Sequence, residues 1–166
     1  LGPACYACQF IVRRELLTDY MFKEGVYFED TEWTPRILIK AQRVASTDMM
    51  VYNYLFREGS ITQSVDEAKK RKVLADKLLL VDSLKAQMQQ VVDKRWFEGM
   101  IAQTVISIIS YVAANYYDKR KEVMTALVEK NIFPLSTYQA NQTGKRKIAW
   151  ANVSPRLLCF ILHLKN

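Results

Sequence analysis

The chain has 166 residues, half of them apolar, and a formal net charge of +7. This length and apolar content suffice for one sizeable core or two small ones, so the composition excludes a disordered or a fibrous protein. The cysteines Cys5, Cys8 and Cys159 are odd in number and widely spaced. That spacing argues against a disulfide framework and indicates a reducing compartment.

An uninterrupted apolar run of about 18 residues would predict a membrane span. Residues 99–114 come closest, but four polar residues interrupt them: Gln103, Thr104, Ser107 and Ser110. We therefore expect a chain that does not cross a bilayer. It begins at Leu1, without an initiator methionine or a signal-like segment, so we expect it to be a piece of a longer protein.

The positive charge belongs to the second half of the chain. Residues 1–63 hold 7 Lys and Arg against 8 Asp and Glu, whereas residues 64–166 hold 17 against 9. Basic clusters occur at residues 69–72, 119–121 and 145–147. They fit nucleic acid, anionic lipid or a phosphorylated lipid substrate, and each also fits an ordinary solvated surface.

Residues 1–63 have a mixed texture. The apolar run 6–12 is rich in aromatic and β-branched residues and predicts a strand, as does the alternating segment 49–56. Helices are predicted over residues 15–22 and 31–42. Asp30 or Thr31 is expected to cap the longer helix, with Pro35 in its first turn.

Residues 64–166 read as helical. Ser64 and Glu67 have capping-box spacing and open a helix that runs to about residue 90. A second helix over 94–116, apolar on more than one side, is the expected core, and a third covers 118–131. Two short helices broken around Ser154-Pro155 follow. The predicted fold class is α+β and predominantly helical, with one domain over 1–63 and a helical domain over 64–166.

Several motifs favour an ordinary structural role. Cys5 and Cys8 form a C-x-x-C pair without a second pair or zinc-spaced histidine, so both are expected to be small core residues. His163 is the single histidine, and we expect it to be structural. The glycosylation-like triplets at Asn141 and Asn152 are expected to be chance matches.

The acidic stretch Glu29-Asp30 is the candidate for chemistry. A carboxylate at a helix N-terminus is held by free backbone N–H groups and by the helix dipole, which suits a general base acting on a hydroxyl. Trp33, one turn on, offers the flat face on which sugar rings pack. The alternative is a capping cluster. Arg57, before the Gly59-Ser60 turn, could contact anionic oxygen or form a salt bridge to Glu29, Glu32 or Glu58.

Three phrases in order carry a family resemblance. They are Phe10-Ile11-Val12-Arg13-Arg14-Glu15-Leu16-Leu17, then Gly25-Val26-Tyr27-Phe28-Glu29-Asp30, then Tyr52, Tyr54, Arg57, Gly59, Ser60 and Ile61. On these phrases, residues 6–63 resemble the C-terminal half of bacterial family 2 glycosyltransferases. That family has a GT-A fold and moves a sugar from a nucleotide donor to a hydroxyl acceptor. Residues 64–166 resemble the variable tail of such enzymes in general character.

The resemblance implies roles for five residues. Asp30 matches the catalytic base of an inverting transfer, and Glu29 would orient that base or the acceptor. Trp33 would line the acceptor pocket, and Arg57 with Ser60 would lie near the acceptor or the donor phosphates. The fold implied for residues 1–63 is the acceptor-side part of a GT-A domain.

The resemblance also implies partners that this chain does not hold alone. A divalent metal ion, Mg or Mn, is expected in the parent enzyme, but its D-x-D ligands do not occur in this sequence, so the chain alone is expected to be inactive. The substrates would be a nucleotide sugar and a glycan or lipid-linked acceptor for bacterial surface polysaccharide. The expected location is the cytoplasm, with peripheral contact at the inner face of the membrane and no nucleic acid bound. The alternative function is a non-catalytic basic helical module that binds nucleic acid or a protein partner.

Overall fold

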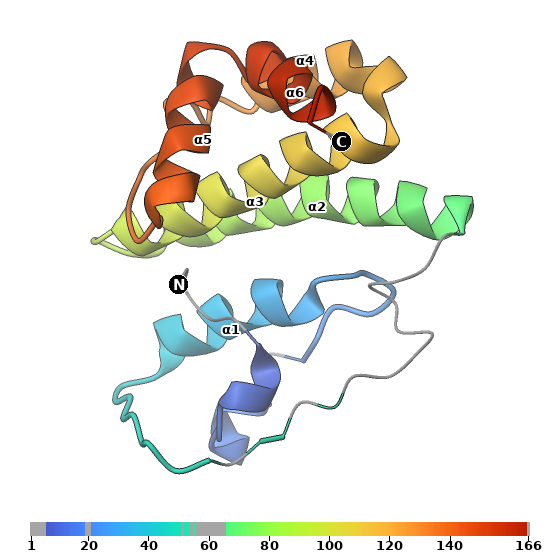
Figure 1. Ribbon diagram of the computed structural model, residues 1–166. Coiled ribbons are helices and arrows are strands. Elements are labelled where there is room, and N and C mark those ends of the chain that lie inside the picture. The colour runs from blue at the N-terminus through green and yellow to red at the C-terminus, as the bar shows by residue number, and fades with distance from the viewer. Residues whose placement is uncertain (1–5, 19–20, 51, 54, 56–65, 166) are drawn as a thin grey trace. The chain divides into compact units, whose positions relative to one another are not determined.

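The computed structural model describes residues 6–18, 21–50, 52–53, 55 and 66–165. Every regular element in these ranges is a helix (Figure 1). The expected α+β fold class, with the strands of a GT-A fold, is therefore wrong for the part of the chain that the structure describes. In chain order the elements are the 3₁₀ helices η1 (Ala7–Gln9) and η2 (Arg14–Leu17), then α1 (Glu29–Lys40), α2 (Glu67–Met88), α3 (Arg95–Asn115), the 3₁₀ helix η4 (Tyr117–Lys119), α4 (Arg120–Glu129), α5 (Gln142–Val153) and α6 (Pro155–His163).

The two predicted strands fail for a common reason. Within residues 6–12 the chain forms the short helix η1 and is otherwise irregular, and the described residues between 49 and 55 have no regular structure. A strand is stable only where a neighbouring strand supplies backbone hydrogen bonds, and the described ranges contain no such partner. Apolar side chains in the second segment, such as Met50 and Leu55, are exposed.

Contacts divide the chain into two compact units, Cys5–Asp76 and Lys77–Asn166, and the division falls inside α2. In the first unit, α1 packs against η1 and η2. The second unit holds the rest of α2 and the helices α3 to α6. The boundary predicted between residues 63 and 64 lies outside the described residues.

Helix α3 is the core of the unit Lys77–Asn166. Helices α4, α5 and α6 all pack against it (Figure 1). Eleven of its residues are buried, among them Phe97, Val105 and Ile108. The prediction of a core helix over 94–116 is confirmed, and so is the prediction of two short helices that meet at Ser154-Pro155.

By length and mean hydropathy alone, α3 could also cross a membrane, which differs from the expectation based on its polar residues. More than half of its most apolar window, 56%, is buried inside the protein. The hydroxyl of Thr104 is satisfied within the helix, since it donates to the Met100 carbonyl at 2.9 Å. A core helix can have the same length and composition as a membrane span. Because more than half of this window is buried, we treat α3 as a core helix.

Side-chain caps set the starts of three helices. Asp66 caps α2 by accepting the backbone N–H of Ala68 at 2.8 Å, while Ser64 of the predicted capping box lies outside the described residues. Asn141 and Ser154 accept backbone N–H groups in the first turns of α5 and α6. Such caps each stabilise a helix by about 1 kcal/mol.

Two close contacts hold the segment between α4 and α5. The side chain of Asn152 binds both backbone groups of Leu135, with its Oδ1 accepting the N–H at 2.6 Å and its Nδ2 donating to the carbonyl at 3.0 Å. At Gly99 of α3, an added Cβ would lie only 2.9 Å from the Tyr138 carbonyl oxygen. Glycine is therefore the residue that lets this segment approach α3.

The expected structural roles of the cysteines and the histidine are met in part. His163 stacks on Tyr117 with ring centroids 3.6 Å apart, and its Nδ1 donates to the Ala113 carbonyl at 2.9 Å, which supports a structural role. The prediction that Cys8 is a core residue is wrong, since its side chain is exposed, and Cys5 lies outside the described residues. Cys8 is the middle residue of the short helix η1, and no strand among the described residues covers its side chain.

Candidate functional site

The approach to α1 is built from unusual backbone conformations. Gly25 has a φ of 72° and Phe28, directly before the helix, has a φ of 65°. Glycine adopts such angles freely, but a bulky aromatic residue does so at a cost of about 1–3 kcal/mol, and positions of this kind cluster at functional sites. We call residues 25–30 the entry turn. It ends in the acidic pair Glu29 and Asp30, the first two residues of α1.

The start of α1 differs from the prediction. The helix begins at Glu29 rather than near residue 31, and its N-cap Phe28 makes no side-chain cap bond. Asp30 and Thr31 therefore lie inside the first turn instead of capping it. Pro35 lies beyond the first turn, within the helix and buried.

Two side chains from the start of α2 hold the entry turn. The carboxylate of Asp76, which is 6% exposed, accepts the Tyr27 backbone N–H at 2.7 Å. Lys72 Nζ lies 2.8 Å from the same carboxylate oxygen and donates to the Gly25 carbonyl at 2.5 Å. The ammonium also lies 5.2 Å from the centroid of the Tyr27 ring. All of these residues belong to the unit Cys5–Asp76, and we call Lys72 and Asp76 the clamp.

Asp30 has one fixed and one unengaged carboxylate oxygen. Its Oδ1 accepts the Thr31 backbone N–H at 2.7 Å and lies 3.3 Å from the Thr31 hydroxyl. Its Oδ2 has no hydrogen-bond partner in the described ranges, and the side chain is half-buried. Glu29 is exposed and makes no ion pair with any residue the structure describes. The acidic pair can therefore accept a proton or a hydrogen bond from a ligand.

The third acid of the cluster is committed to a local ion pair. Glu32 Oε2 accepts bonds from Nε and Nη2 of Arg36 at 3.1 and 2.8 Å, and the same Nη2 donates to the Met21 carbonyl at 3.0 Å. This pair joins α1 to the segment that precedes the entry turn. Glu32 is thereby set apart from Glu29 and Asp30.

Trp33 lies inside its unit. It is 5% exposed, and its ring packs on Phe22 with centroids 4.8 Å apart. Together with Thr34, Pro35 and Ile37 it forms the buried face of α1. In this structure the flat face expected to meet a sugar ring is covered by protein. Arg57 and Ser60 lie outside the described residues.

Sequence reasoning missed the clamp. Asp76 lies four residues before the buried Leu80, so it falls on the apolar face of the predicted helix. A carboxylate at that position was the one sign in the sequence that Asp76 has a partner. A charge at such a position is rare unless a partner satisfies it. The partner could not be read locally, because the donor to this carboxylate is the backbone N–H of Tyr27, 49 residues away.

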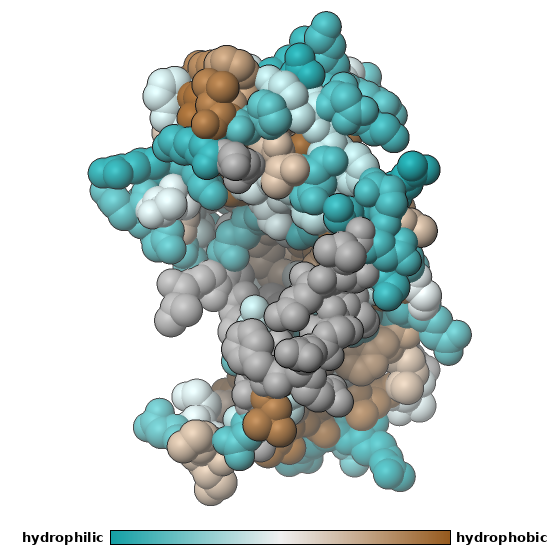
Figure 2. All heavy atoms as spheres, turned by 45° about the vertical axis from the view of Figure 1, so that its right-hand side comes forward, coloured by the Kyte–Doolittle hydropathy of each residue, from teal (hydrophilic) through white to brown (hydrophobic). Residues whose placement is uncertain are grey.

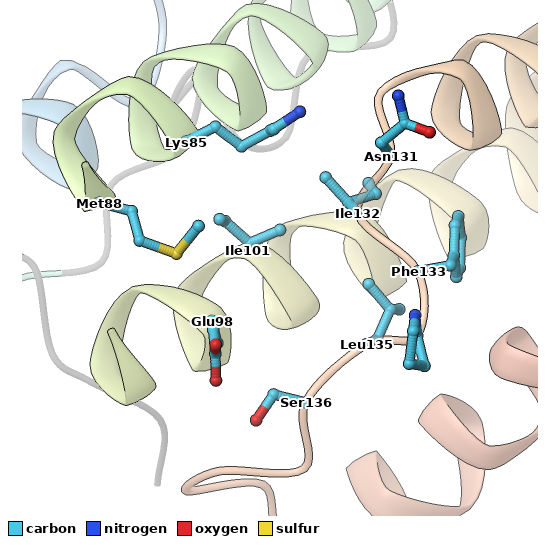
Figure 3. A pocket seen from close by; sticks show the side chains of 10 residues that line it. Lys85, Met88, Glu98, Ile101, Asn131, Ile132, Phe133, Leu135 and Ser136 are labelled. Carbon is cyan, nitrogen blue, oxygen red and sulfur yellow. The ribbon is translucent and has the colours of Figure 1, made fainter. Parts of the chain in front are cut away.

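A cavity of about 280 Å³ lies in the other unit (Figure 3). Its walls come from the end of α2, the start of α3 and residues 131–136. The charged side chains on it are Lys85, whose Nζ donates to the Lys130 carbonyl, and Glu98. The hydroxyl of Ser136 accepts the Tyr138 N–H at 3.2 Å. No paired nucleophile and base lines this cavity.

Titratable groups in other parts of the chain have shifted pKa values. Burial lowers the pKa of Lys77, whose Nζ donates to the Ser107 hydroxyl at 2.6 Å. Burial raises the pKa of the Cys159 thiol, with Arg120 opposing the rise. Hydrogen bonds from Arg95 lower the pKa of the exposed Asp93 to about 2. Each follows from a local structural contact, so none marks a catalytic group by itself.

A metal site is not formed by the residues that the structure describes, since no group of three or more His, Cys, Asp or Glu comes together there. No protein-family model matches this chain, and neither the curated proteins nor the solved structures contain a significant match.

Proposed function

We propose that the chain is the acceptor-side part of an inverting glycosyltransferase, in which Asp30 removes the proton from an acceptor hydroxyl. The observation that carries the proposal is the Asp30 carboxylate: Oδ1 is fixed by the Thr31 N–H, while Oδ2 has no partner among the described residues. The held entry turn and the strained Phe28 before the acidic pair add support, because such features recur at functional sites. The three ordered phrases in residues 10–61 supply the reaction class.

In the proposed reaction the acceptor oxygen attacks the anomeric carbon of a nucleotide sugar, opposite the diphosphate. The hydroxyl proton passes to Asp30, the new glycosidic bond forms, and the electron pair of the broken bond leaves with the nucleoside diphosphate. The anomeric configuration is inverted. A parent protein would supply the donor site and the divalent Mg or Mn ion that stabilises the leaving charge.

The other candidate residues take supporting roles. The exposed Glu29 would accept a hydrogen bond from a second hydroxyl of the acceptor and so orient it. Trp33 would hold α1 in place through its contact with Phe22. Arg57 and Ser60 are proposed to contact acceptor or donor phosphates. The acceptor would be a glycan or lipid-linked glycan at the cytoplasmic face of a bacterial membrane.

The test is Asp30→Asn in the parent enzyme, assayed by release of nucleoside diphosphate from a panel of nucleotide sugars with lipid-linked acceptors. Asparagine keeps an oxygen for the Thr31 N–H but cannot take up a proton. We expect kcat to fall by about 10²–10⁴-fold, the usual contribution of a general base, with the donor KM and the circular dichroism spectrum unchanged.

Glu29→Gln is the matched control, since it removes the neighbouring exposed carboxylate. Its kcat should stay within about tenfold of the unaltered enzyme while the acceptor KM rises, as expected for an orienting group. Near-normal turnover of Asp30→Asn would remove Asp30 from the role of base.

A further inference from the structure

Helices α5 and α6 carry exposed apolar residues on their outer sides. Ile148 and Ala151 of α5 and Leu158 and Cys159 of α6 are buried. The outer residues are 37–74% exposed: Trp150, Val153, Leu157, Phe160 and Leu164. We call these five the α5–α6 apolar face. Figure 2 shows apolar side chains gathered among hydrophilic ones on the upper part of the surface it displays.

The spacing within each helix makes this face regular. Trp150 and Val153 are three residues apart on α5, and Leu157, Phe160 and Leu164 follow the i, i+3, i+7 pattern along α6 and its C-cap. Residues at this spacing line one side of a helix. Since α5 and α6 also pack against each other, both helices have their apolar inner sides satisfied and still expose apolar outer sides.

The charged side chains of α5, α6 and the segments that flank them have one sign. From residue 131 to the end, the sequence contains five Lys and Arg and no Asp or Glu. Lys145 and Arg146 are exposed on α5, and Lys165 is exposed after α6. In the described ranges none of these three forms an ion pair. Arg156 donates to the Thr125 hydroxyl at 2.9 Å rather than to a carboxylate.

This combination points to one kind of partner. A surface that takes up Trp, Phe and Leu side chains and attracts uncompensated cations must be apolar inside and anionic outside. An anionic phospholipid membrane has both properties, and interfacial helices characteristically pair these residue types. Nucleic acid would satisfy the cations but leave the aliphatic residues exposed to water. The α5–α6 apolar face is separate from the cavity described above, because none of the residues that line that cavity belongs to α5 or α6.

We infer that the α5–α6 apolar face and its flanking cations dock on an anionic phospholipid membrane surface. The helices lie on the membrane rather than crossing it, with Phe160 and Leu164 in the headgroup boundary. Lys145, Arg146 and Lys165 then contact lipid phosphates. This inference does not depend on the proposed transferase activity.

Flotation of the full chain with vesicles tests the inference. We expect binding to vesicles of equimolar phosphatidylcholine and phosphatidylglycerol and little binding to pure phosphatidylcholine. The double variant Phe160→Gln, Leu164→Gln should weaken binding at least about tenfold, given the apolar area each side chain withdraws from water. Lys145→Gln with Arg146→Gln should weaken it by a similar factor and reduce its salt dependence.

The controls are Val128→Gln on α4, which removes an exposed apolar residue elsewhere in the same unit, and Lys121→Gln on α4. Both should leave vesicle binding unchanged. Any one of three results would overturn the inference: no binding to anionic vesicles, equal binding by the Phe160→Gln, Leu164→Gln variant, or a concentration-dependent dimer that this same variant abolishes. Binding that single-stranded RNA displaces and that ignores the apolar substitutions would likewise replace the membrane with nucleic acid.

Discussion

At the scale of single residues, Asp76 is the side chain on which the entry turn depends. Its buried carboxylate accepts the Tyr27 N–H and pairs with Lys72, whose side chain is 42% exposed. The partly exposed ion pair is screened by water and contributes little by itself. The bond from the backbone N–H to a buried charge is the stronger element, at about 1.5–3 kcal/mol.

Asp76→Ala should therefore release the entry turn. The Tyr27 N–H loses its acceptor and Lys72 loses its counter-charge, so we expect hydrogen exchange of residues 25–30 to accelerate at least about tenfold, as a loss of about 1.4 kcal/mol implies. Exchange measured peptide by peptide reports this directly.

The matched control is Asp82→Ala on the same helix. Asp82 is half exposed and pairs with Lys130, and both residues belong to the unit Lys77–Asn166. Its removal should therefore leave exchange in residues 25–30 unchanged. Unchanged exchange in Asp76→Ala itself would show that the clamp does not hold the turn.

Part of the site could be read from the sequence at this scale. The acidic pair does lie at the start of a helix, as predicted, because short-range patterns of acids before an apolar periodic segment report helix starts. The clamp and the burial of Trp33 depend on contacts that local patterns do not show. Tyr27 binds Asp76, and Phe22 packs on Trp33. A residue type alone does not say which side of a helix meets solvent.

At the scale of elements, α3 shows how a single glycine positions a neighbouring segment. Gly99→Ala should raise helix propensity by about 1 kcal/mol but force its Cβ to 2.9 Å from the Tyr138 carbonyl, and such overpacking costs about 1–3 kcal/mol. We expect a net loss of stability and a lower Tm by calorimetry.

Glu98→Ala, at the exposed neighbouring position, supplies the comparison for this substitution. Its Tm should change less than that of Gly99→Ala, because the side chain is exposed and lies only in the first turn. A stabilised Gly99→Ala variant would mean that the segment at Tyr138 can shift at no cost.

The helices could be predicted and the strands could not, for physical reasons. Helical hydrogen bonds close between residues four apart, so the pattern over 94–116 contains most of what decides that element. A strand needs a second strand elsewhere in the chain to pair with, and the alternating side-chain pattern over residues 49–56 does not show whether such a strand exists. The start of α1 was misplaced because Phe28 adopts a left-handed conformation that its residue type disfavours.

At the scale of the whole molecule, the division into two units indicates that the unit Lys77–Asn166 can fold independently. The buried residues of α3 to α6, together with Val81 and Leu84 of α2, all belong to Lys77–Asn166. A core of this kind, closed within one stretch of chain, is the property of an independently folding domain. The helical domain predicted over residues 64–166 stays a prediction, because its boundary lies outside the described residues.

Residues 66–166 expressed alone should therefore fold. We expect a helical circular dichroism spectrum and one cooperative urea transition, with a free energy of unfolding of about 5 kcal/mol or more, typical of a domain of this size. A broad, non-cooperative transition would show that this unit needs the rest of the chain. The double variant Val81→Ala, Leu84→Ala should abolish the cooperative transition, because each buried truncation costs about 1–5 kcal/mol.

The pairing of Asn152 with Leu135 has a consequence for covalent modification. An oligosaccharide is attached to asparagine through its side-chain nitrogen, and Nδ2 of Asn152 donates one of its two N–H groups to the Leu135 carbonyl. Production in a eukaryotic secretory host would thus set sugar attachment at the Asn152-Val153-Ser154 triplet in competition with folding. A glycan there leaves one N–H on Nδ2, so it would disturb the contact between Asn152 and Leu135 by its bulk rather than by removing the donor.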